Sequence, residues 1–394
     1  MKRDTNVLLF RFLYFAAYFA DAFFTPFYGL YLKSLHFSDL EVSIALGMIP
    51  FAACLGSVLI GRFAKSFHRN LFLLRLLVLL ELAGVLLLAF LSAYPALLAT
   101  VILLAFANGV YYQVEDGAGS YCFKRNGKKF SKLRIYGSIG FGVALGILYF
   151  LLQALSYRWI FVCAAGVYVL CLVLLFFLHD YPDEESGIAL TSTHPQSSLF
   201  HNSSFVFFFF FYIFLNGAMG IQGYILPLYL DSLGLSKSAY SLLNAFRVAV
   251  ETVTVLCYVP IKKLFRSERN CLLLGAFILF LSSIAIVIFP DPYPIAFANY
   301  FCRGVGGALL FIAFVDYLSA ILPSSLLTRG MAFTSAAMDI FVGSFNFASS
   351  AIYTATSYVT FFWILAGISF LGFAFLFGAK DERNLAPKAP KETE

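Results

Sequence analysis

Apolar runs long enough to cross a membrane follow one another along almost the whole chain. About 20 apolar residues in an α-helix span a hydrocarbon core of roughly 30 Å. Twelve such runs are expected, at residues 7–32, 40–62, 71–92, 95–121, 133–154, 158–178, 205–230, 240–261, 271–289, 294–321, 330–353 and 358–379. The pattern therefore predicts an all-α membrane protein with twelve transmembrane helices.

The longest polar interval, residues 179–204, divides the twelve spans six and six. We expect an N-terminal six-helix bundle over residues 1–178, a cytoplasmic linker over 179–204, a C-terminal six-helix bundle over 205–380 and a cytoplasmic tail over 381–394. The segment LYLKSLHFS (30–38) matches LYLDSLGLS (228–236) at six of nine positions, and the basic loops GRFAKSFHRN (61–70) and IKKLFRSERN (261–270) occupy corresponding places. These echoes predict two pseudo-symmetric halves, an arrangement that many transporters share.

Lysine and arginine are distributed unevenly over the loops. With both termini and the linker in the cytoplasm, nineteen of them lie on that side and only Lys33, Arg158 and Lys237 on the other. Cytoplasmic loops carry such an excess, so we expect a multi-pass protein of the cytoplasmic (inner) membrane with both termini in the cytoplasm. The composition, 61% hydrophobic and 12% charged, agrees with a lipid bilayer as the partner. The basic residues follow the membrane rule, so nucleic acid is not an expected partner.

Polar residues recur at helical spacing inside three of the spans. Residues three or four apart lie on one face of a helix. Such stripes comprise Arg11, Tyr14, Tyr18, Asp21, Thr25 and Tyr28; Tyr240, Asn244, Arg247, Glu251, Thr254 and Tyr258; and Ser335, Asp339, Asn346, Ser349 and Tyr353. A charge at the bilayer centre costs about 2.5–3.5 kcal/mol, so we expect these stripes to line an aqueous cavity. The alternatives are that Arg247 pairs with Glu251 along their own helix, that Asp21 is structural, and that Arg11 extends to the membrane surface.

A further charged pair is expected between the fourth and fifth spans. Arg134 enters the fifth span in LRIYGSIGF, and the fourth span carries Glu115 and Asp116 near its end. An arginine and a carboxylate on adjacent helices can pair with each other and then hydrogen-bond a polar solute as donor and acceptor. The sequence leaves open which of the two carboxylates faces the cavity.

Twelve spans, a long central loop and a basic loop after the second span resemble the major facilitator superfamily. That loop keeps Gly61, Ala64 and Arg69 of the family motif but has Lys65 where the family has aspartate. The resemblance covers nearly the whole chain. It implies a fold of two six-helix bundles and transport by alternating access.

A narrower resemblance lies in the fifth span. KLRIYGSIGF is similar to the signature of the oligosaccharide:proton symporters and of the phenylpropionate permease-like group. In the former, a fourth-span carboxylate eighteen residues before a fifth-span arginine binds sugar, and an aromatic residue seven positions after the arginine stacks on it. Asp116, Arg134 and Phe141 stand at these spacings. Because the aromatic residue is Phe rather than Trp, an aromatic solute fits as well as a sugar.

The resemblance implies a secondary active transporter that imports a small polar organic solute (a sugar, nucleoside or aromatic acid) by proton symport. The residues expected to bind solute are Asp21, Tyr18, Asp116, Arg134, Phe141, Gln222, Arg247, Arg303 and Asn346. No histidine lies deep in a span, so the proton is expected on a carboxylate: Glu251, Asp21, Asp339 or Asp316. We expect a monomer with no metal and no cofactor beyond the proton gradient, and sodium coupling stays open.

Other functions fit the sequence less well. A proton-coupled drug efflux antiporter, the main alternative, usually has a Gly-Pro element in the fifth span, which here reads GSIGFGVALG. A membrane sensor that transports nothing would leave the three polar stripes unexplained. An enzyme is not expected, because the sequence has no Walker loop, nucleophile elbow or His/Cys metal cluster.

Overall fold

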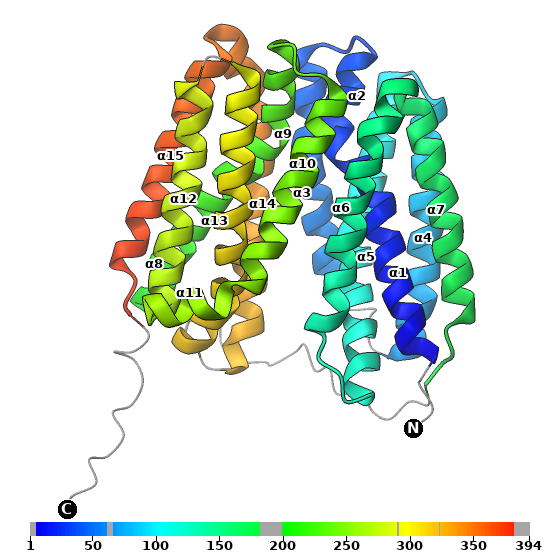
Figure 1. Ribbon diagram of the computed structural model, residues 1–394, viewed down its shortest axis with the longest axis horizontal. Coiled ribbons are helices and arrows are strands. Elements are labelled where there is room, and N and C mark those ends of the chain that lie inside the picture. The colour runs from blue at the N-terminus through cyan, green and yellow to red at the C-terminus, as the bar shows by residue number, and fades with distance from the viewer. Residues whose placement is uncertain (1–4, 61–65, 182–198, 290, 323, 382–394) are drawn as a thin grey trace, which may run out of the picture. The chain divides into compact units, whose positions relative to one another are not determined.

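The computed structural model describes residues 5–60, 66–181, 199–289, 291–322 and 324–381, and this part of the chain is built from helices (Figure 1). The first half contains α1 (Thr5–Asp21), η1 (Thr25–Phe27), α2 (Tyr28–Ser34), α3 (Asp39–Ile60), α4 (Phe67–Phe90), α5 (Tyr94–Arg125), α6 (Ser131–Ala154) and α7 (Tyr157–Phe177). The second half contains α8 (Ser203–Phe211), η3 (Tyr212–Asn216), α9 (Gly217–Ser232), α10 (Lys237–Leu256), α11 (Tyr258–Phe265), α12 (Glu268–Ile288), α13 (Pro292–Ile321), α14 (Ser324–Ala355) and α15 (Tyr358–Gly378). Every predicted span coincides with one helix or with a broken helix, which confirms the all-α fold.

Among the described residues, ten helices are long and apolar enough to cross a membrane, and the bent pair α10 and α11 supplies an eleventh. The remaining span is α14, 32 residues long and rich in Ser and Thr. Helices suit this setting because they satisfy every backbone hydrogen bond within the segment. Large apolar side chains such as Phe150 and Phe176 are about 70% exposed, as expected of residues that face lipid.

Three spans that the pattern predicts as continuous are interrupted. The first breaks between Asp21 and Thr25, just before Pro26. The seventh contains a π-helical turn at Tyr212–Asn216. The eighth bends by 59° between α10 and α11, because the ring of Pro260 cannot be accommodated by the preceding helical turn.

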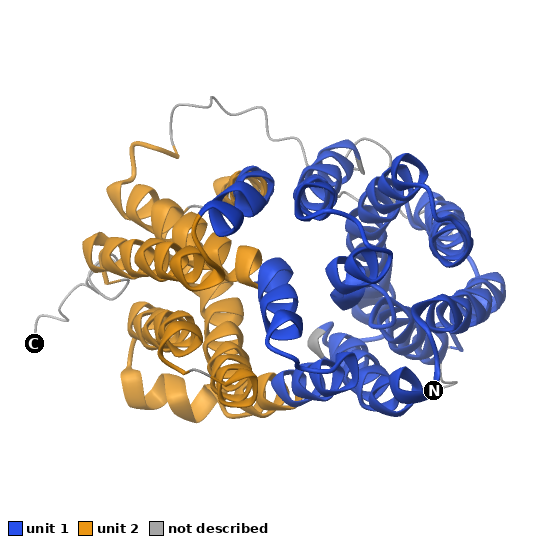
Figure 2. Ribbon diagram, turned by 90° about the horizontal axis from the view of Figure 1, so that it is seen from above, with its two compact units in different colours: residues 1–190, 223–248, 342–355 blue, residues 191–222, 249–341, 356–394 orange. Residues whose placement is uncertain are grey.

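The chain divides into two compact units (Figure 2). Unit 1 comprises residues 1–190, 223–248 and 342–355, and unit 2 comprises residues 191–222, 249–341 and 356–394. Each unit combines segments that are far apart in the sequence but in contact with one another. The bundles expected over residues 1–178 and 205–380 are continuous in the sequence, and this division remains a proposal. Most of the linker and of the tail lies outside the described residues, as do Gly61, Ala64 and Lys65 of the loop motif.

The echo between residues 30–38 and 228–236 corresponds to two turns of the same geometry. His36 and Gly234, which are equivalent in the echo, both have positive φ, at 64° and 89°. Each turn is closed by a backbone hydrogen bond from the residue that follows, Phe37 to Leu32 and Leu235 to Leu230. A left-handed residue closed in this way ends a helix, so the two segments end their helices by the same device.

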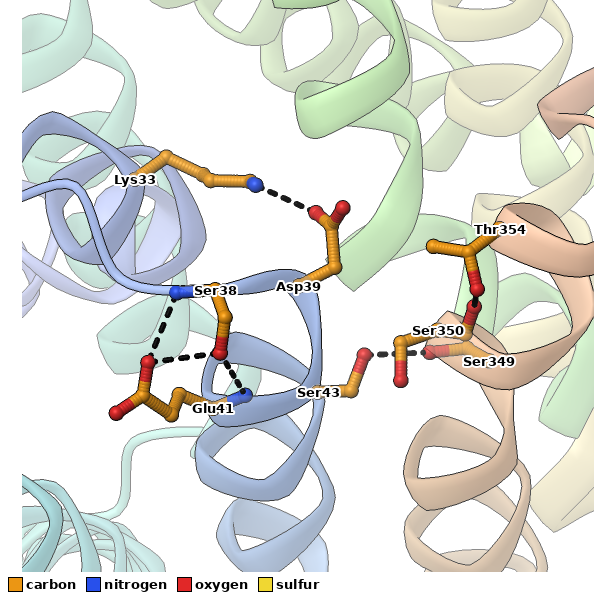
Figure 3. A network of polar contacts seen from close by, with 8 residues as sticks. All are labelled: Lys33, Ser38, Asp39, Glu41, Ser43, Ser349, Ser350 and Thr354. Atoms are coloured by element: carbon orange, nitrogen blue, oxygen red, sulfur yellow. Dashed lines mark hydrogen bonds and ion pairs between the residues drawn. The ribbon is translucent and has the colours of Figure 1, made fainter.

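Within unit 1, segment 342–355 of α14 packs against α3 through polar groups (Figure 3). The hydroxyls of Ser43 and Ser349 lie 3.1 Å apart and are fully buried. Nearby, Lys33 forms an ion pair with Asp39, with 2.5 Å between Nζ and Oδ1. Small hydroxyl side chains allow helices in a membrane to approach closely and to hydrogen-bond.

Candidate solute-binding and proton-binding site

The expected charged pair between the fourth and fifth spans is formed in unit 1. Nη1 of Arg134 on α6 lies 2.9 Å from Oδ2 of Asp116 on α5. The hydroxyl of Tyr14 on α1 donates to the other carboxylate oxygen at 2.8 Å. Glu115 points elsewhere, since it is fully buried and accepts from the hydroxyl of Tyr111. Asp116 is therefore the carboxylate that meets the arginine, and both side chains of the pair remain partly exposed, Arg134 at 41% and Asp116 at 28%.

The glycines that follow Arg134 bring α1 against α6. A Cβ atom on Gly140 would lie 2.3 Å from the carbonyl oxygen of Phe15, and one on Gly137 would lie 2.8 Å from the ring of Tyr18. Any larger side chain at these positions would push the two helices apart. The glycine-rich run of the fifth span thus holds the tyrosines of α1 close to the helix that carries Arg134.

A second polar cluster surrounds Asp21 at the end of α1. Its Oδ1 accepts hydrogen bonds from Thr25 at 2.5 Å and from the amide of Asn108 at 2.8 Å. Glu81 on α4 lies close to this cluster, with its Oε2 3.5 Å from the hydroxyl of Tyr168. Asp21 is 7% exposed and Glu81 is 1% exposed. Two carboxylates therefore lie close together in a buried place where, among the described residues, neither forms an ion pair.

The structure adds residues that the sequence analysis missed. Asn108, Tyr112 and Asp116 recur every four residues along α5 and connect the two clusters, with the ring of Tyr112 centred 4.4 Å from that of Tyr18. This stripe has the same helical period as those in the first and eighth spans, so the pattern could have revealed it. Glu81 could not be found in this way, because it is a single polar residue in an apolar stretch of its helix.

In unit 2, Gln222 belongs to a buried network of uncharged groups. Its amide nitrogen donates to Ser283 at 2.6 Å, and its oxygen accepts from Asn299 at 3.4 Å. Four residues further along α13, Nη2 of Arg303 donates to the carbonyl of Met219 at 3.2 Å. Gln222 and Arg303, both predicted to bind solute, therefore have polar partners on neighbouring helices of unit 2.

The other residues predicted to bind solute are placed as follows. Phe141 is half-buried on α6. Arg247 donates to Asn244 one turn earlier on α10 at 3.4 Å. Asn346 on α14 is fully buried, and its side-chain amide has no hydrogen-bond partner among the described residues. The role of Asn346 and of Phe141 in binding solute therefore stays a prediction.

The carboxylates predicted to carry the proton are in different surroundings. Glu251 on α10 and Asp339 on α14 are partly buried within their spans. Asp316 has an exposed side chain that lies 3.7 Å from Nζ of Lys262. Among the described residues, no group of three or more His, Cys, Asp or Glu could hold a metal ion.

Comparison with protein families identifies the class to which this arrangement of helices belongs. The sequence matches the model of the Major Facilitator Superfamily over residues 11–292 and again over residues 218–394. The chain therefore belongs to the Major Facilitator Superfamily, and it is a multi-pass membrane transporter rather than an enzyme. A comparison with curated protein sequences finds no match.

Solved structures of transporters share the fold. The nucleoside transporter NupG is 17% identical, with a TM-score of 0.79 over 96% of this chain and 100% of that chain. A D-xylose-proton symporter is 15% identical, with a TM-score of 0.72 over 94% and 96% of the two chains. An auto-inhibited POT family peptide transporter is 12% identical, with a TM-score of 0.76 over 95% and 97%. At these identities the likeness establishes the fold alone.

Proposed function

We propose that this transporter imports a small polar organic solute together with a proton by alternating access. The observation that carries the proposal is the Asp116–Arg134 pair, an ion pair inside membrane-spanning helices whose two side chains remain partly exposed. Charged residues inside a membrane are costly, and those that occur usually face a partner or a substrate pathway. Because this pair is still partly exposed, both of its side chains could contact a ligand. The guanidinium would donate to the solute in a bidentate manner, and the carboxylate would accept from it.

The aromatic residues around the pair define the kind of solute that would fit. Tyr14 and Tyr18 are stacked with ring centroids 6.2 Å apart, and Tyr112 lies against Tyr18. Aromatic faces combined with a donor and an acceptor suit a ring that carries hydroxyl or amide groups. Nucleosides are thus the first class to test, which agrees with the nucleoside transporter among the structural neighbours; sugars and aromatic acids follow.

Asp21 is the proton carrier that the geometry of unit 1 supports best. It is buried without an ion pair among the described residues, it accepts a hydrogen bond from Asn108, and Glu81 lies close to it. Glu251 and Asp339 remain proposed carriers, whereas the ion pair of Asp316 with Lys262 gives no support to that residue. We further propose that the solute is driven by the proton gradient without a cofactor, and that both termini face the cytoplasm.

Replacing Arg134 tests the proposed site. We expect Arg134→Ala to abolish solute uptake into proteoliposomes, because it removes the donor and leaves Asp116 without its partner, while circular dichroism and gel filtration remain as in the wild type. Arg75→Gln is the matched control, since Arg75 is also within a span but donates to the carbonyl of Leu175. Wild-type uptake by a folded Arg134→Ala protein would remove this pair from the site.

A further inference from the structure

A groove on unit 1 lies apart from the proposed solute site. Its lining residues come from α1, α6 and α7. In Figure 1, α1 lies between α6 and α7 and packs against both, whereas these two helices have little contact with each other. The groove has a volume of about 590 Å³. Leu8, Ile139 and Leu170 at its rim are 44–52% exposed. Since all three helices are membrane spans, the rim faces the lipid.

The groove contains one charged side chain, that of Arg11. Its guanidinium carbon lies 5.4 Å from the ring centroid of Tyr136 and 6.0 Å from that of Phe123. The Nε atom is buried and has no acceptor, and Arg11 forms no ion pair among the described residues. Rings with a favourable quadrupole offset only part of the cost of burying a cation. The groove therefore lacks an anion that would match its guanidinium.

Basic side chains lie near one end of the groove, and apolar side chains line it, which matches the charged headgroup and the acyl chains of a phospholipid. Lys132 is exposed one turn before Tyr136 on α6, and Lys129 is exposed in the preceding turn. Apart from Arg11 and Tyr136, the side chains that line the groove are apolar, among them Phe15 and Ile139. Basic pockets between membrane helices bind the headgroups of anionic lipids.

We propose that this groove binds one anionic membrane phospholipid. Its phosphate would accept a bidentate pair of hydrogen bonds from Arg11, with Lys132 adding to the positive potential, and an acyl chain would lie along α1 between Ile139 and Leu170. A phosphate matches the fork of guanidinium donors, and the apolar walls match the chain. This binding site is independent of the transported solute and of proton coupling.

Native mass spectrometry of the purified full-length protein tests the proposal. The probes are phosphatidylglycerol and phosphatidylcholine with identical acyl chains, supplied as an equimolar mixture. We expect the wild type to retain one phosphatidylglycerol about tenfold more than phosphatidylcholine, the size of effect that a charge-assisted hydrogen bond gives. Arg11→Gln should reduce this preference to parity, and Arg75→Gln should leave it unchanged. Equal retention by the wild type, or an undiminished preference in Arg11→Gln, would overturn the proposal.

A second variant covers the case in which Arg11→Gln does not fold. Ile139→Trp places an indole in the groove from its lipid-exposed rim and leaves Arg11 intact. We expect this variant to lose the retained phosphatidylglycerol, because the space for the acyl chain is filled. Retention at the wild-type level would show that the lipid lies elsewhere and would contradict the proposed groove.

Discussion

Asp21 and Glu81 are two carboxylates buried close together in one unit, where Asp21 accepts a hydrogen bond from Asn108 and Glu81 one from Tyr168. Two ionised carboxylates without a cation would be costly to bury there, so we propose that one of them carries a proton. Asp21 is the more exposed of the two. Asp21 is therefore our proposed carrier of the transported proton.

Asp21→Asn is therefore expected to separate accumulation from exchange. An amide retains the size and one hydrogen-bond acceptor of the carboxylate but cannot take up a proton. Uptake driven by an imposed pH gradient should be lost, whereas exchange of labelled for unlabelled solute at equal pH should continue. Glu251→Gln is the comparison for the eighth span. A proton-driven accumulation that survives in Asp21→Asn would place the coupling proton on another carboxylate.

The two left-handed turn residues provide a test of the internal repeat. Gly234 has φ of 89°, where a Cβ atom costs about 1–2 kcal/mol. Gly234→Ala should consequently lower the melting temperature of the purified protein. His36→Gly, at the equivalent turn, should raise it or leave it unchanged, because glycine adopts φ of 64° without strain. A lower melting temperature in both variants would argue against this account of the turns.

At the residue scale, the sequence allowed some of the site to be predicted. The Asp116–Arg134 pair could be anticipated, because its eighteen-residue spacing matches a known family and both residues lie at the ends of adjacent spans. The stripe that contains Asn108 has a helical period and could have been found in the sequence, but its contact with Asp21 and the position of Glu81 could not. Both depend on which faces of α4 and α5 turn toward α1, and helix rotation is set by packing rather than by hydropathy.

At the scale of elements, hydropathy predicted where helices cross the membrane but not where they break. The three interruptions, near Pro26, at Tyr212–Asn216 and before Pro260, lie inside apolar runs that a window of about 20 residues reads as continuous. Prolines mark two of them. The π-helical turn has no such marker in the sequence.

The crossing of α3 and α14 gives a prediction about elements. A Cβ atom on Gly343 would lie 2.6 Å from the ring of Phe51, so Gly343→Ala should separate the two helices. In a protein whose seven native cysteines are replaced, the pair Ser43→Cys and Ser349→Cys should cross-link on mild oxidation, since the native hydroxyls are 3.1 Å apart. We expect Gly343→Ala to slow this cross-linking severalfold.

Gly367→Ala is the matched control for that experiment, because a Cβ atom at Gly367 would meet no atom within 4 Å. Cross-linking should proceed in this control at the rate of the parent protein. If Gly343→Ala and Gly367→Ala cross-linked equally fast, the close approach of α3 and α14 would not depend on the absence of a side chain at Gly343.

At the scale of the whole molecule, the family membership and the twelve spans rest on features distributed along the entire chain. This is why hydropathy predicted the spans, and why their number together with the basic loop after the second span resembled the family. The solute depends on a few side chains, and their chemistry permits several polar ring compounds. The proposed orientation rests on the loops, where nineteen basic residues lie on one side of the membrane and three on the other. The arrangement of the helices does not itself indicate which side is the cytoplasm.

The most direct test of the account measures external pH in a weakly buffered suspension of proteoliposomes while nucleosides, sugars and aromatic acids are added singly. Solute–proton symport predicts that one class makes the medium more alkaline, and that neither protein-free liposomes nor Arg134→Ala proteoliposomes respond. That result would establish the coupling and identify the class of solute together. Uptake of a labelled solute with no change in external pH would contradict proton symport.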